Sequence, residues 1–180
     1  MGFIKWLIWL VVVVIIVVAI GYLYMMSGVY DVAATKHHSA LVAWALDTGM
    51  TASVEHQARG ITVPVQSAMA DTLKGFSHFN DMCVPCHGGP GIERAEFGQG
   101  LYPRGPHLSR AAGDWTDAQL FWIIKHGVKD TGMPAFAPTH TDEQIWSIVA
   151  FLRYLPHLSD SDYGNLLDSL GTAMPEEHED

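Results

Sequence analysis

An uninterrupted apolar segment near the N-terminus constrains the fold of this chain more than any other feature. From Trp6 to Met26 no ionisable side chain other than tyrosine occurs. As a helix rising about 1.5 Å per residue, this segment would span the roughly 30 Å hydrocarbon core of a bilayer. The alternative is a cleaved signal peptide, whose apolar region is normally about 7 to 15 residues long. The length of the segment favours a retained membrane anchor within residues 1–30.

The charges that flank this segment predict its orientation. Lys5 and the amino terminus lie on one side, and only Lys36 and Arg59 follow in the nearer part of the chain on the other side. The positive-inside rule therefore favours a cytoplasmic N-terminus. The rest of the chain would then lie on the periplasmic side of a bacterial inner membrane, where a lone cysteine pair is ordinarily oxidised.

Acidic side chains outnumber basic ones, with 19 Asp and Glu against 10 Lys and Arg, and the formal net charge is −9. This balance argues against nucleic acid and against an anionic membrane surface as partners. Residues 158–180 contain no lysine or arginine and end in an acidic cluster. We expect this segment to be a solvated and partly disordered C-terminal tail.

Residues 31–69 are expected to form a connector with one helix, from Ser39 to Arg59, that ends before Gly60. The apolar stripe of this helix is weak, because Thr48 and Gly49 follow on the face that begins with Leu41 and Trp44. The connector would serve either as a flexible leash or as a docking element packed on another subunit. Leu41, Trp44 and Met50 favour docking.

Residues 70–157 are expected to form a small all-α domain. Helices are predicted from Asp71 to Cys86, from Thr116 to His126 and from Thr141 to Tyr154. The last two helices each begin with the S/T-x-x-E/Q capping box, formed by Thr116 with Gln119 and by Thr141 with Gln144. So few helices enclose little core, and a domain of this kind usually needs a disulfide, a metal or a large cofactor.

Both cysteines of the chain lie in the sequence Cys83-Val84-Pro85-Cys86-His87. C-x-x-C-H is the attachment signal for c-type haem. Two thiols on one helical turn would add to the two vinyl groups of haem, and the adjacent imidazole would reach the iron from the same side. A thioredoxin-like pair would instead need a βαβ setting, and a zinc site would need a second Cys/His pair at short spacing. The sequence provides neither context, so it predicts one covalently attached haem c.

The residues around this motif resemble a class I monohaem c-type cytochrome. "GFSHFNDMCVPCH" at residues 75–87 resembles the first helix of that family, and "PHL" at residues 106–108 resembles its Pro-x-Leu motif. "TGMPAF" at residues 131–136 resembles the loop that delivers the distal methionine, and "TDEQIWSIVAFLRYLP" at residues 141–156 resembles the final helix. The resemblance covers a little under half of the chain. It implies an all-α fold around haem, iron ligation by His87 and Met133, and electron transfer as the activity.

Residue type alone does not identify Met133 as a ligand, because a methionine more often fills a core than binds a metal. Gly132 and Pro134 favour a rigid, irregular turn that would direct the thioether inward. His/Met is also a recognised axial pair of c-type cytochromes. The rival sixth ligands are one methionine beside the attachment motif and three histidines, namely Met82, His107, His126 and His140.

Three further residues are expected near the haem. The resemblance makes the carbonyl of Pro106 the acceptor for the second ring hydrogen of His87, with Pro103 as a rival. Arg104 and Trp122 would contact the haem propionates or ring, although a loop charge and a core aromatic residue agree equally well with the sequence.

With both axial positions filled, the iron has no site for oxygen or peroxide and can only change its oxidation state. We therefore expect an electron carrier and not an enzyme, acting alone or as a subunit of a membrane oxidoreductase complex. Membrane lipid would bind the N-terminal helix. The expected redox partners in a respiratory chain are quinol-oxidising complexes, dehydrogenases and terminal oxidases. The alternatives are a haem-based gas or redox sensor and a peroxidase-like enzyme, which would need an open iron and a distal acid–base residue such as His126 or His140.

Overall fold

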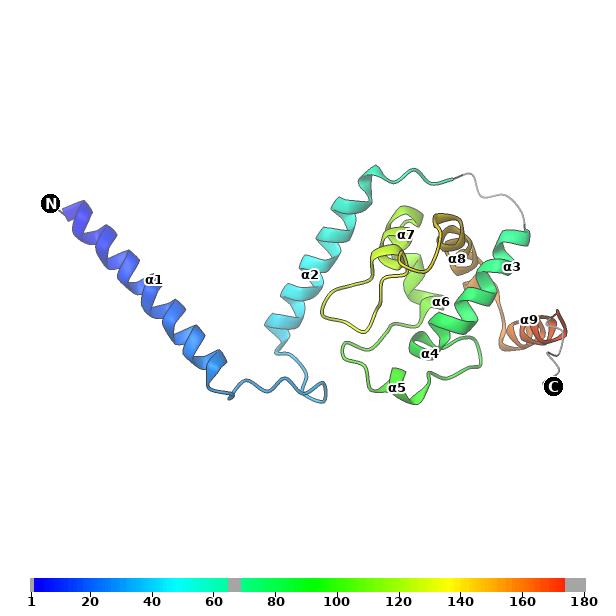
Figure 1. The fold of residues 1–180 in the computed structure, drawn as a ribbon, viewed down its shortest axis with the longest axis horizontal. Helices are drawn as coiled ribbons and strands as arrows, with labels where there is room; N and C mark the ends of the chain where they lie inside the picture. The colour runs from blue at the N-terminus through cyan, green and yellow to red at the C-terminus, as the bar shows by residue number, and fades with distance from the viewer. Residues whose placement is uncertain (1, 65–68, 174–180) are drawn as a thin grey trace. The chain divides into compact units, whose positions relative to one another are not determined.

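The computed structural model describes residues 2–64 and 69–173, and the regular elements in those residues are all helical (Figure 1). The all-α fold class predicted from the sequence is therefore confirmed. Internal contacts divide the chain into two units, Met1–Lys36 and His37–Asp180.

The first unit contains one long helix, α1, which runs from Gly2 to Met26. None of its side chains is buried within the protein. Its length and apolar composition suit a single membrane crossing, as expected of an N-terminal anchor.

The second unit begins with α2, Ala40–Gln57, followed by the short 3₁₀ turn η1, Ala58–Gly60. The Ser39 hydroxyl caps α2 by accepting a hydrogen bond from the Val42 amide at 3.4 Å. The helix predicted from Ser39 to Arg59 is therefore confirmed. The second half of α2 and the turn η1 pack against the rest of the unit, because Val54 and Ala58 are buried.

The core of the second unit forms where α3, Met69–His78, packs against α8, Asp142–Tyr154 (Figure 1). Gly75 permits this approach, because a Cβ atom there would lie 1.9 Å from the backbone oxygen of Ser147. Phe76 and Phe79 are fully buried and pack on Phe151, with ring centroids 5.3 and 5.1 Å away.

The helix predicted from Asp71 to Cys86 is helical throughout but not uniform. After α3, the π-helical turn η2 covers Phe79–Cys83 and α4 covers Val84–His87. A π turn is a common device at functional sites. Here it ends at Cys83, the first residue of the attachment motif.

The second predicted helix is α7, Asp117–His126, and both α7 and α8 begin with the predicted capping boxes. The side-chain oxygen of Gln119 accepts from the Thr116 amide at 2.7 Å, and that of Gln144 accepts from the Thr141 amide at 2.8 Å. Between these helices and α4 lie the short elements α5, Glu96–Gln99, α6, Leu108–Ala111, and η3, Ala112–Asp114.

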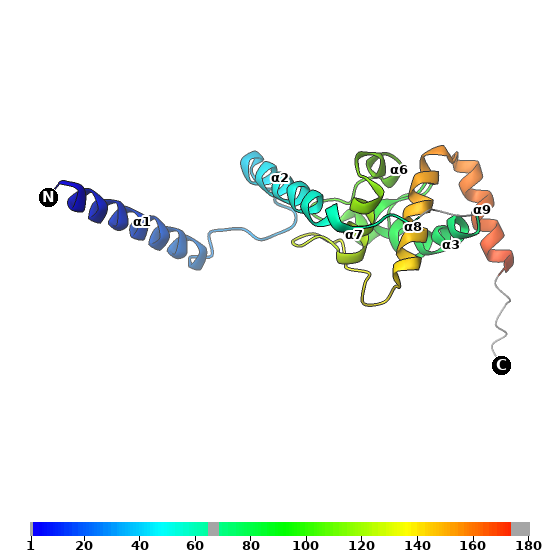
Figure 2. The same ribbon diagram turned by 90° about the horizontal axis from the view of Figure 1, so that it is seen from above.

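The C-terminal segment differs from the prediction. After the 3₁₀ turn η4, Leu155–His157, residues Asp160–Ala173 form the helix α9, which lies beside α3 (Figure 2). Tyr163 is fully buried, with its ring 5.2 Å from that of Phe76. The expectation of a solvated, partly disordered tail is therefore wrong for α9, while residues 174–180 lie outside the described part of the chain.

Candidate cofactor site

A cavity of about 350 Å³ lies within the second unit, and its volume is typical of sites for small molecules and cofactors, roughly 300 to 1,000 Å³. Six of the seven residues predicted to contact a cofactor line this cavity, namely Cys83, Cys86, His87, Arg104, Pro106 and Met133. The seventh, Trp122, is not among the lining residues. Its half-buried ring instead packs against His126 at 5.2 Å.

The two thiols come from successive elements, with Cys83 at the end of η2 and Cys86 within α4. Both are free, and burial raises the pKa of the Cys83 thiol to about 12, with the neighbouring Cys86 adding to the shift. Redox-active cysteine pairs have lowered pKa values instead. No group of three or more His, Cys, Asp and Glu side chains that could hold a metal ion occurs among the described residues.

His87 is buried, and its ring has a defined hydrogen bond. Nδ1 donates to the carbonyl oxygen of Pro106 at 2.7 Å, because a carbonyl can only accept. The neutral ring then carries its lone pair on Nε2, the atom available to a metal. Burial lowers the pKa of His87, which favours this neutral form. The acceptor is the carbonyl expected from the family resemblance and not that of the rival, Pro103.

Arg94 is a part of the site that the sequence did not reveal. Its Nε donates to the carbonyl oxygen of Cys86 at 3.0 Å, and its Nη2 donates to that of Gly105 at 2.8 Å. The guanidinium thus joins the end of the attachment motif to the loop that carries Pro106. In the sequence, a single arginine among glycines and prolines is typical of a solvent-exposed loop residue. Its distance from the attachment motif along the chain does not indicate a structural role.

The loop around Met133 is fixed by short-range hydrogen bonds. The Thr131 hydroxyl donates to the Val128 carbonyl at 2.7 Å and accepts from the Met133 amide at 3.0 Å. The loop begins at Gly127, whose φ of +66° suits glycine and where a Cβ would lie 2.7 Å from the Met133 carbonyl oxygen. Met133 is half-buried against the core and has a set position in the cavity wall.

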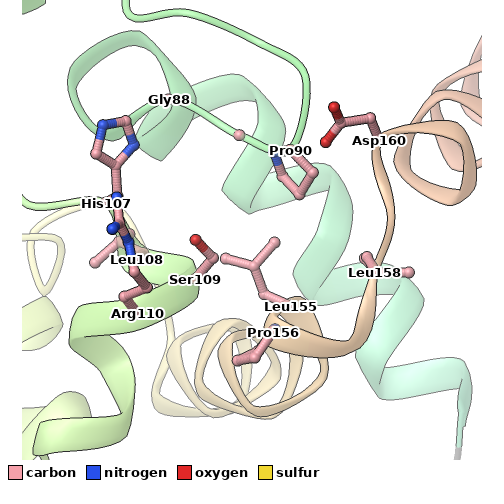
Figure 3. Close-up of a pocket in the computed structure, with 11 residues that line it drawn as sticks. Gly88, Pro90, His107, Leu108, Ser109, Arg110, Leu155, Pro156, Leu158 and Asp160 are labelled. Atoms are coloured by element: carbon pink, nitrogen blue, oxygen red, sulfur yellow. The ribbon is translucent and has the colours of Figure 1, made fainter.

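Of the rival ligands, only Met82 also lines this cavity. His126 and His140 do not, and the ring of His140 instead contacts that of His78 at 5.1 Å. His107 lies on a second cavity of about 310 Å³, between the loop after α4 and the start of α9 (Figure 3). Arg110 and Asp160 also border that second cavity.

The donor set of the main cavity fits haem c. It combines two thiols one helical turn apart, an imidazole with its outer nitrogen available, a thioether from a separate loop and apolar walls. The apolar walls come chiefly from α7 and α8, through Leu120, Ile123, Ile124, Ile148 and Leu152. Such a surface suits a large, flat, apolar macrocycle with one metal at its centre.

Comparison with known proteins agrees with this fit. Residues 70–152 match the family model described as cytochrome c oxidase, cbb3-type, subunit III. No curated protein matches the chain significantly. The matched segment includes every residue so far named as lining the main cavity.

Proposed function

We propose that this chain, whose residues 70–152 form a c-type cytochrome domain, is a membrane-anchored carrier of single electrons. The observation that carries the proposal is the convergence of Cys83, Cys86, His87 and Met133 on one apolar cavity. Cys83 and Cys86 would hold one haem c covalently, and His87 and Met133 would be its axial ligands.

When bound, haem c supplies reversible one-electron redox chemistry. The protein's own groups prepare its site. Pro106 orients the His87 ring so that Nε2 is available, and the hydrogen bonds of Thr131 hold Met133 in place. The walls from α7 and α8 are apolar and would shield a bound haem from water. A thioether ligand favours the reduced state relative to a second imidazole, so we expect a comparatively high potential.

We further propose that the haem domain lies on the periplasmic side of a bacterial inner membrane. The charge pattern around α1 supports this orientation. Tethering would raise the effective concentration of the domain toward membrane partners. Quinol-oxidising complexes, membrane dehydrogenases and terminal oxidases of a respiratory chain are the partner classes that this arrangement suits. The protein would serve them as a free carrier or as a fixed subunit of an oxidoreductase complex.

A haem-based sensor or a peroxidase-like enzyme would need an open coordination site, and the latter also a distal acid–base group. Neither of the histidines considered for that role, His126 and His140, lines the cavity. The electron carrier is therefore the better-supported proposal.

The test is to produce the full chain together with a haem-attachment system and to record its spectra. We expect a pyridine haemochrome typical of thioether-linked haem, the weak far-red band of iron–methionine ligation in the oxidised form, and slow binding of carbon monoxide to the reduced form. Absence of covalent haem would overturn the proposal. Rapid carbon monoxide binding by the wild type would favour a sensor or an enzyme.

A further inference from the structure

The helix α2 lies outside the segment that matches the cytochrome family, yet it is packed on the cytochrome domain. It contacts α7, and so does the turn η1 that follows it. Val54 and Ala58 are 1% and 5% exposed, and Ile61 packs against the main core. The second half of α2 and the turn η1 therefore pack within the second unit, whereas Leu41 and Trp44, which favoured docking on another subunit, are exposed.

One face of α2 reaches the main cavity. Asp47 and Met50 line the same cavity as Cys83, Cys86 and Met133. Asp47, Met50, Val54 and Ala58 follow one another at helical spacing, so a single stripe of the helix faces both the cavity and the core. Of these two lining residues, Asp47 is exposed and Met50 is half-buried.

A separate contact fixes the N-terminal end of α2. The His38 amide donates to the Tyr102 hydroxyl at 2.8 Å, and the His37 ring stacks on the Tyr102 ring at 4.9 Å. The residues on either side of Tyr102, Leu101 and Pro103, line the cavity. The loop that leads to Pro106 and the start of α2 are thus tied together.

We propose that α2 forms one wall of the haem pocket and contacts the bound haem through Met50 and Asp47. This inference rests on the proposed haem site. Among the described lining residues, Asp47 is the one acidic side chain and Arg104 the one permanent cation. A carboxylate near the iron stabilises the oxidised, more positive state, so Asp47 would lower the midpoint potential. The family match does not contain this wall, because it begins at residue 70.

The first test uses the full chain with haem attached and its methionine methyl groups labelled with ¹³C. A methyl group beside a reduced, diamagnetic haem is shifted strongly by the ring current. We expect the Met50 signal, assigned by its loss in Met50→Leu, to lie well away from its position in the denatured protein. A Met50 signal at the denatured position in a protein that carries haem would overturn the proposal.

The second test measures the midpoint potential of Asp47→Asn, which keeps the size of the side chain and is not expected to disturb folding. Glu55→Gln is the matched control, because Glu55 is an exposed acid on the same helix and does not line the cavity. We expect an upward shift for Asp47→Asn that clearly exceeds the shift for Glu55→Gln. Equal midpoint potentials for the two variants would show that Asp47 does not contact the haem.

The two proposals fail in distinguishable ways. If no haem becomes attached, the proposed function itself is wrong. If haem is attached with the far-red band present, but Met50 and Asp47 give the negative results above, only the role of α2 is wrong.

Discussion

At the scale of single residues, the site depends on groups whose positions are fixed by backbone hydrogen bonds. His87 has its Nδ1 occupied by the Pro106 carbonyl, and Met133 is held through Thr131. A loop residue therefore orients each candidate ligand. Arg94 joins the segment that contains Cys86 to the loop that contains Gly105. Because these hydrogen bonds hold the candidate ligand atoms in the folded domain, little reorganisation should accompany a change of oxidation state.

The assignment of Met133 as the distal ligand predicts the behaviour of Met133→Ala. Loss of the thioether should lower the midpoint potential, abolish the far-red band and allow rapid carbon monoxide binding to the reduced form. Met82→Leu is the matched control, since Met82 lines the same cavity. Redox titration and stopped-flow mixing measure both effects. If Met82→Leu changes the spectrum and Met133→Ala does not, the ligand is Met82.

A pair of histidines away from the cavity predicts a dependence of stability on pH. Burial lowers the pKa of His78, the charge of His140 lowers it further, and Asp81 opposes the shift. A lowered pKa means that protonation is unfavourable in the folded state. Stability should therefore be complete above the ordinary value of 6.5 and decrease as the pH falls through the folded-state pKa.

The variant His140→Gln separates these causes. It should raise the pKa of His78 toward its ordinary value and reduce the loss of stability below pH 6.5. NMR titration of the His78 ring and urea unfolding on either side of that pH measure the two effects. His157→Gln, at an exposed position, is the control. An unchanged His78 titration in His140→Gln would contradict the electrostatic explanation.

At the scale of secondary-structure elements, the crossing of α3 and α8 and the docking of α9 build the core that supports the attachment motif. Both capping boxes could be predicted, because a cap depends on residues three positions apart. The signals for α9 were also present, since Ser159 caps its start and Tyr163, Leu166, Leu167 and Leu170 recur at helical spacing. The acidic composition of the segment, which favours a solvated tail, outweighs these signals when only the sequence is known. The π turn has no comparable local signal.

Gly75 lies in the close contact between α3 and α8, whereas Gly49 lies in α2 with open space around it. We therefore expect replacement by alanine to have opposite effects on stability at these two positions. Gly75→Ala would place a Cβ 1.9 Å from the Ser147 oxygen, so the helices must separate, at a cost of about 1 to 3 kcal/mol or more. Gly49→Ala, in α2, meets nothing within 4 Å and should stabilise its helix by about 0.5 to 1 kcal/mol. Chemical denaturation of the haem-loaded variants measures both. Equal stability of the two variants would contradict the packing described here.

At the scale of the whole molecule, an N-terminal helix suited to a membrane is followed by a helical domain that matches a cytochrome family model over residues 70–152 and whose cavity is also lined by a helix from the connector. The main helices and the irregular loop of Met133 could be predicted, because each depends on residues close together in the sequence. The place of α2 could not be predicted. The face of α2 that packs on the domain carries the acidic Asp47 together with the apolar Met50 and Val54. A face with both acidic and apolar residues does not identify itself as a buried face until the cavity beside it is known.

The arrangement of the core around a cavity predicts that haem is needed for folding. At about 24 cal/mol per Å³, an unfilled cavity of about 350 Å³ would cost about 8 kcal/mol, a cost as large as the whole stability of a typical domain, about 5 to 15 kcal/mol. The double variant Cys83→Ala/Cys86→Ala, made without a haem-attachment system, should therefore lack a cooperative urea transition while α1 still retains it in the membrane fraction. Circular dichroism and alkaline extraction of membranes measure these two properties. A cooperative transition at the urea concentration of the haem-loaded protein would mean that the helices alone close the core, and that the cavity is not what the cofactor fills.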